Sequence, residues 1–215
     1  MEVHSSTFIK DERADMEFPK YYHQIEKIRL FDPLAEVLGS CNEGIIEFSF
    51  SDVVSFAGHG CPTVGGAYLM TLMGLKLLYK NLIPIRGTIE VHMGQAKDSG
   101  TTGVVAAVAG FILGASDEGG FKGLAGNYFR NNLIKFSQDF KGHMRLVRID
   151  TGESVTLEYH PEIVPGNQLT GILLEKILKN VATIEEKKEF QTIWNQRLEK
   201  IMVNEISNPN LIITR

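Results

Sequence analysis

A short motif and the helical pattern that follows it read GHGCPTVGGAYLMTLMGLKLLY, residues 58–79. Pro62 fixes its own φ and lacks an N–H, which suits the first turn of a helix, so we predict a helix over 62–79 with Cys61 near its N-cap. Few positions of this helix are polar. Because a helix that is apolar nearly all round is buried, we expect it to lie inside the domain.

The motif also holds one of the two cysteines of the chain, and Cys61 lies two residues after His59. A thiol at a helix N-terminus is close to the positive end of the helix dipole, which favours the thiolate form. Gly58 and Gly60 allow the backbone to bend so that imidazole and thiol face the same point. Such a pair is half of a soft metal site or a nucleophile with its base, although cysteine often simply packs in a core.

Three glycines interrupt the predicted helix at positions 65, 66 and 74. Glycine lowers helix stability, so we expect these positions to allow close approach of another backbone, such as that of a second helix. A second apolar helix, rich in Ala and Val, is predicted over 101–113, and Gly114 can end it in the left-handed conformation.

The other periodic segments predict an α+β fold, in which a mixed sheet packs against apolar helices and a helical extension follows at the C-terminus. We expect a mobile arm over 1–17, an α+β domain over 18–166 and a Lys- and Glu-rich helical extension over 167–215. Further helices are predicted at 19–28, 33–39, 51–56, 169–180 and 184–205, and strands at 45–50, 86–93, 133–136, 144–149 and 154–159.

Composition excludes several classes of protein. The chain has 215 residues, 43% of them hydrophobic, and a net charge of −4, so there is no basic excess for nucleic-acid binding. The longest apolar run, 104–115, is too short to span a bilayer, and the polar N-terminus does not resemble a secretory leader. Two cysteines are no disulfide framework, so we expect a cytoplasmic protein, with a Cys41–Cys61 bridge left open.

The motif region resembles the FmdE-like family, which is named after a component of formylmethanofuran dehydrogenase. The resemblance is carried by residues 56–62, FAGHGCP, and by Gly66, Leu72 and Gly74, which follow them. The hallmark of that family is a Gly-His-x-Cys-Pro segment opening a long apolar helix. The segment from Thr101 through Ser116 is similar to the second block of the family. The resemblance covers about residues 45–160. It implies a mixed α+β core, a homodimer and a metal ion, often zinc, held partly by His59 and Cys61.

This chain departs from the family pattern in three places. Thr63 stands where Gly is common, Ala115 stands where members often have a further cysteine, and the cysteine-rich C-terminal zinc module is absent. Because zinc takes four ligands, or three and a water, a site here needs donors from elsewhere in the chain. We rank His92, at the end of a predicted strand, first, and His23 and His160 after it; His143 is expected at the surface.

A separate pattern favours an anionic ligand. Ser99, Thr101 and Thr102 lie at the predicted start of the second helix, where hydroxyl and backbone N–H groups suit an anion, although ordinary capping explains them as well. Lys122 and Arg130, on or near a glycine-rich loop, would add positive charge near such a ligand.

The sequence thus leaves three functional hypotheses, with catalytic residues unassigned. The first is a protein that uses zinc or another transition metal at His59 and Cys61 to bind or transform a small anionic or pterin-like molecule. The second is a non-catalytic accessory or metal-delivery partner of a redox enzyme. The third is a metal-free cysteine enzyme that uses Cys61 with His59.

Overall fold

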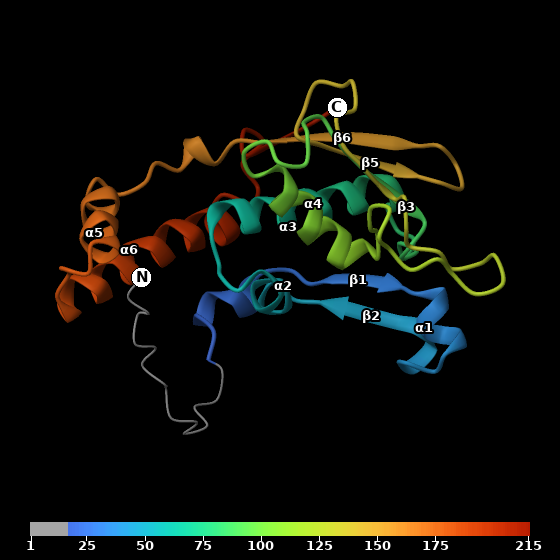
Figure 1. Cartoon of the computed structure of the whole chain (residues 1–215), viewed down its shortest axis with the longest axis horizontal. Coiled ribbons are helices and arrows are strands. Elements are labelled where there is room, and N and C mark those ends of the chain that lie inside the picture. Colours follow the sequence, from blue (N-terminus) through green and yellow to red (C-terminus); the bar gives the residue numbers. More distant parts are fainter. Residues whose placement is uncertain (1–16) are drawn as a thin grey trace, which may run out of the picture.

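The computed structural model describes residues 17–215 and has an α+β fold, as predicted. Helices α3 and α4 form a middle layer, with a five-stranded sheet on one side and the two-stranded β1–β2 sheet on the other (Figure 1). The helices are α1 (Pro33–Val37), α2 (Phe50–Ala57), α3 (Pro62–Tyr79), α4 (Thr102–Leu113), α5 (Leu169–Leu178) and α6 (Ile184–Glu199), and the strands are β1 (Ile28–Phe31), β2 (Ile45–Phe48), β3 (Ile89–Met93), β4 (Ile134–Lys135), β5 (Met144–Arg148), β6 (Ser154–Tyr159) and β7 (Ile212–Thr214).

The sheet is mixed and has the order β4-β3-β5-β6-β7. Strand β3 pairs parallel with β4, placing Val91 opposite Ile134, and antiparallel with β5, placing Val91 opposite Leu146. Strands β5 and β6, both predicted, pair antiparallel as a hairpin, and β7 adds to the far edge of β6 with Ile212 opposite Tyr159. The alternate residues of β3 are buried because they face the helices of the middle layer.

The glycines of α3 accommodate side chains, and this corrects the expectation that a second backbone packs against them. A Cβ atom at Gly66 would lie 2.2 Å from the ring of Tyr159, and one at Gly74 would lie 2.6 Å from Leu146, both on the sheet. Gly65 faces Met202, which follows α6. The glycines therefore let α3 sit close to the sheet on one face and to the C-terminal segment on another.

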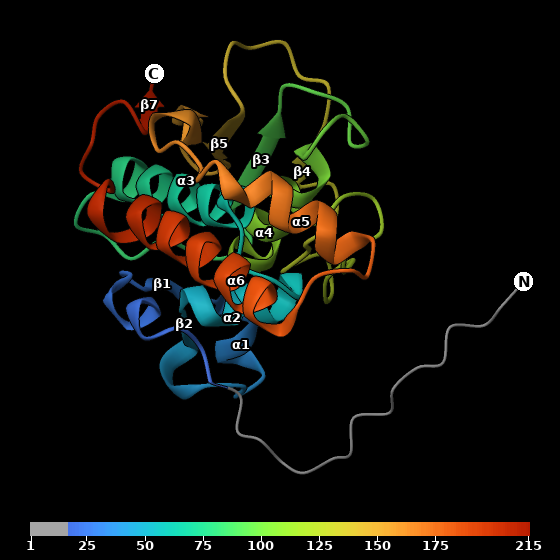
Figure 2. The same cartoon turned by 90° about the vertical axis from the view of Figure 1, so that its left-hand side faces the viewer.

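The C-terminal segment, residues 167–215, contributes to the hydrophobic core of the α+β layers. The predicted boundary at residue 167 therefore does not separate two cores. Leu198, Ile201, Met202 and Leu211 are at most 1% exposed, and β7 completes the sheet. Helix α6 is followed by a π-helical segment, Lys200–Asn204, and only α5 and the first turns of α6 project beyond the layers (Figures 1 and 2). Helices α2 and α4, the five-stranded sheet and the segment after α6 cover α3. Its apolar surface therefore does not require a second copy of the chain, and the homodimer stays a prediction.

The N-terminal region differs most from expectation. The predicted helix over 19–28 is a short 3-10 turn, Lys20–Gln24, and then strand β1, because Ile28 and Leu30 alternate with exposed residues and pair with β2. The predicted arm lies, apart from residue 17, outside the described residues. Cys41 and Cys61 are both free thiols, so no disulfide bond joins them.

Within residues 17–215, no helix combines the length and the apolar character needed to cross a membrane.

Replacing Gly66 with alanine is expected to lower the free energy of unfolding by about 1–3 kcal/mol, the usual cost of overpacking a core. The Tyr159 ring cannot easily move away, because its hydroxyl donates a 2.9 Å hydrogen bond to the Pro62 carbonyl. Gly171 in α5 is the matched control, since a Cβ atom there meets nothing within 4 Å. Gly171→Ala should stabilise by up to about 1 kcal/mol through helix propensity. Urea unfolding measures the free energy of unfolding of each variant. An equal change in Gly66→Ala and Gly171→Ala would contradict the packing argument.

Candidate functional site

The motif joins α2 to α3 as the sequence predicted. Helix α2 ends at Gly58, which takes a left-handed φ of 77°, and α3 begins at Pro62 with Cys61 as its N-cap. The Cys61 sulfur accepts a hydrogen bond from the Val64 N–H at 3.4 Å. The thiol therefore satisfies one of the free donors that every helix start presents.

The C-terminal helix α6 covers this motif. The Trp194 indole donates a 2.9 Å hydrogen bond to the Gly60 carbonyl, and Leu198 packs beside Gly60. Cys61 is buried beneath this cover, whereas His59 is exposed with its Nδ1 3.1 Å from the Ala57 carbonyl oxygen. The imidazole and the thiol thus have opposite environments at one turn of the chain.

The further candidate metal ligands, His92, His23 and His160, lie apart from the motif and have different partners, that of His160 being Glu162. His92 lies on β3 and places Nε2 2.7 Å from the Glu90 carboxylate, which also accepts from Lys135. His23 is exposed and lines a separate pocket with Glu47 and Asp52. Within residues 17–215, no three His, Cys, Asp or Glu side chains come close enough together to hold a metal ion. The described residues do not supply the donor set of a structural zinc site, and zinc binding stays a prediction.

The predicted anion-binding threonines line a cavity of about 420 Å³ between the N-terminal ends of two helices. Thr63 reaches it from α3, and Thr101 and Thr102 reach it from the start of α4. Met70, Met93, Val105 and Tyr159 add apolar surface, and Gln95, His143 and Glu162 add polar groups. Tyr159 connects this cavity to the motif, because it bonds the carbonyl of Pro62, the residue after Cys61.

His143 also lines this cavity, and a backbone hydrogen bond holds its ring. The Tyr159 N–H donates to its Nδ1 at 2.9 Å, so the proton of the neutral imidazole lies on Nε2. His143 is exposed, as the sequence indicated, yet it lines the cavity because β5 begins directly after it. The sequence does not predict Thr63 or Gln95 as ligand contacts, because no local pattern marks either residue.

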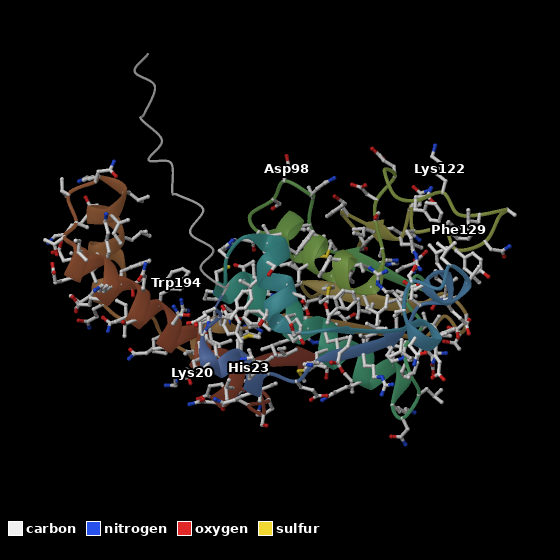
Figure 3. The ribbon with its side chains drawn as sticks, turned by 90° about the horizontal axis from the view of Figure 1, so that it is seen from below. Lys20, His23, Asp98, Lys122, Phe129 and Trp194 are labelled. Carbon is white, nitrogen blue, oxygen red and sulfur yellow. The ribbon has the colours of Figure 1, made fainter. Side chains whose placement is uncertain are left out.

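Of the other residues predicted to contact an anion, Ser99 lies beside the cavity and Lys122 lies in solvent. The Ser99 hydroxyl bonds the Gln95 side chain at 3.0 Å, and Thr102 approaches the same oxygen at 3.4 Å. Lys122 is exposed on the loop after α4 and lines none of the described cavities. Figure 3 shows Lys122 near Phe129, at the opposite end of the molecule from Trp194. Lys122 therefore does not share the threonine cavity.

One carboxylate, that of Glu162, lines the cavity. A backbone hydrogen bond and the His160 side chain, whose Nδ1 is 2.7 Å away, hold the pKa of Glu162 below its ordinary value. Its side chain is 69% exposed, so solvent screens its charge from the interior of the cavity. The threonine hydroxyls, the helix starts and His143 set the polarity of the interior.

Comparison of the chain with models of protein families, with curated proteins and with solved structures finds no match. The resemblance to the FmdE-like family consequently rests on the motif residues themselves and stays a prediction.

Proposed function

We propose that the protein binds a small anionic molecule in the cavity between the starts of α3 and α4. The observation that carries this proposal is that Thr63, Thr101 and Thr102 line one cavity. Helix N-termini carry partial positive charge and unpaired N–H groups, and two of them directed at one cavity favour an anion. His143 also lines the cavity and adds an imidazole to its polar groups.

The walls restrict the ligand further. Met70, Met93 and Val105 give one side of the cavity an apolar surface, so the ligand should carry a compact apolar part next to its anionic group. A volume of about 420 Å³ is typical of small-molecule sites. A small carboxylate or a phosphorylated metabolite matches this description.

The groups around the cavity support binding more than catalysis. Burial raises the pKa of Tyr159, and its hydroxyl already donates to the Pro62 carbonyl, so this phenol is no general base near neutral pH. The Cys61 thiol caps α3 under the cover of α6. We therefore assign no reaction step to these residues.

The proposal is tested by measuring the binding of inorganic phosphate and of short carboxylates by calorimetry. Thr102→Val and His143→Ala are each expected to weaken binding about tenfold, since a hydrogen bond to a charged group contributes about 1.5–3 kcal/mol. His23→Ala is the control, because His23 lies in a different pocket. Unchanged affinity in both cavity variants would contradict the proposal.

The proposed role of Cys61 in metal binding can be tested without loss of the fold. Serine is a preferred N-cap, so Cys61→Ser should keep α3 intact and change the free energy of unfolding by less than about 1 kcal/mol. If His59 and Cys61 hold zinc, the metal content of the purified variant should fall sharply against the unchanged protein. Equal metal content in the two proteins would refute the assignment.

A further inference from the structure

The helical hairpin of α5 and α6 extends beyond the layers of the fold and is thinly covered (Figures 1 and 2). Helix α5 packs on α6, and Leu173 is the one buried side chain of α5. Four apolar side chains at or beside the turn between the two helices are exposed, and together we call them the hairpin patch: Leu174, Leu178, Val181 and Ile184. None of them lines the threonine cavity.

The hairpin patch prolongs a face of α6 that is buried farther along the helix. Ile184 precedes Leu198 by fourteen residues, which is almost four helical turns, so both side chains lie on the same side of α6. Leu198 is 0% exposed where α6 crosses the motif, and Ile184 is 68% exposed. The apolar face of α6 therefore continues past the elements that cover it.

Helix α5 shows the same loss of cover toward the turn. Leu174 and Leu178 are four residues apart and therefore share one side of α5. Leu178 is nearer the turn and is the more exposed of the two. An apolar helix face is stable when another element packs on it, and no element within residues 17–215 covers these side chains.

The charges around the hairpin patch favour a second copy of this chain as its cover. Residues 174–189 carry four lysines and four glutamates, so this surface has no net charge. A nucleic acid or an anionic membrane attracts a basic excess, which residues 174–189 do not have. Two copies of a neutral surface of mixed charge do not repel each other, and lysines of one copy can face glutamates of the other.

The size of the surface sets the strength of the contact that we expect. A stable protein interface usually takes about 20–30 residues from each partner. Residues 174–189 are fewer than that, so they suit a weak contact between copies, with a Kd of about 1–100 μM.

We propose that the hairpin patch binds the hairpin patch of a second copy, so that the two helical hairpins form a four-helix bundle about a two-fold axis. In such a bundle each helix buries a second side, and apolar side chains of both copies share one core. Since other elements of the same chain already cover α3, this contact and not α3 would hold the dimer together.

Analytical ultracentrifugation of the full chain over about 1–300 μM tests the association. The average mass should rise from that of the 24.0 kDa monomer toward twice this value as the concentration increases. A mass that stays at the monomer value throughout would overturn the proposal.

Two variants test whether the contact lies on the hairpin patch. Ile184→Asp puts a carboxylate into the first turn of α6, where the helix dipole favours it, so the fold should persist. At the contact the same carboxylate would lie unpaired against apolar side chains, so the dimer should weaken about tenfold or more. Leu178→Ser removes apolar area from α5 and should weaken the dimer in the same direction.

Ile172→Asp is the matched control. Ile172 is exposed, and it also lies in the first turn of its helix. It precedes Leu174 by two residues, about 200° around the helix, which places it on the opposite side of α5. Circular dichroism should show native helix content in all three variants. Unchanged dimer affinity in Ile184→Asp and Leu178→Ser, or an equal loss in Ile172→Asp, would refute the hairpin patch as the contact.

Discussion

Replacing Asp32 with alanine is expected to lower the free energy of unfolding by about 3–5 kcal/mol, the usual effect of removing one partner of a buried ion pair. Asp32 is 3% exposed and accepts from Arg86 at 2.8 Å and from Arg130 at 2.6 Å. It also caps α1 through the N–H groups of Leu34 and Ala35. Without this carboxylate, both guanidinium groups lose their only acidic partner within the described chain.

Urea unfolding of three variants separates the contributions of Asp32. Asp32→Asn retains an oxygen that can cap α1 and removes the charge. It should therefore lower the free energy of unfolding by less than Asp32→Ala does. Asp150→Ala is the control, since Asp150 pairs with Arg148 at the surface and such pairs contribute about 0–1 kcal/mol. Equal losses in Asp32→Ala and Asp150→Ala would show that burial of the cluster is unimportant.

The same residue predicts how stability depends on pH. Burial alone would raise the pKa of Asp32, but hydrogen bonds from Arg86 and the Ala35 N–H, and the charge of Arg130, outweigh burial and hold this pKa below its usual value. A carboxyl whose pKa is depressed in the native state stabilises the fold above its unfolded pKa of about 3.9. That contribution is lost as the pH falls through the native pKa. The stability difference between the unchanged protein and Asp32→Asn should therefore shrink below about pH 4.

A chain that ends at residue 167 is expected not to fold. It lacks Leu198, Ile201, Met202 and Leu211, which are at most 1% exposed, and it lacks strand β7. Full burial of such a side chain contributes about 1.5–3 kcal/mol, so the four together contribute roughly 6–12 kcal/mol. The total stability of a typical domain is only about 5–15 kcal/mol.

Circular dichroism and one-dimensional proton NMR of the shortened chain test this expectation. Leu178→Ser in the full chain is the control, because Leu178 is 73% exposed on the projecting end of α5. This substitution should change the free energy of unfolding by less than about 0.5 kcal/mol. A dispersed NMR spectrum and native helix content in the shortened chain would mean that the α+β layers fold without the C-terminal segment.

The features that the sequence predicted well are those that neighbouring residues determine. Pro62 at the first helical position and Cys61 at the cap set the start of α3, and the predicted bounds of that helix match the structure. Gly114 ends α4 with a left-handed φ of 65°, as its lack of a side chain allows. Strands β5 and β6 follow the alternation of their own residues, and the turn between them is local.

Only the tertiary structure determined the rest, because it depends on segments that are distant in the chain. Residues 28–31 become a strand since β2 pairs with them, and helical spacing cannot report that partner. Thr63 of α3, Thr102 of α4 and His143 in the loop before β5 line one cavity although they are far apart in the chain. Asp32 and Arg130 are 98 positions apart, and their ion pair forms because packing brings both side chains into one buried place. Periodicity along a sequence reports which face of an element is buried, and not which distant residue it is buried against.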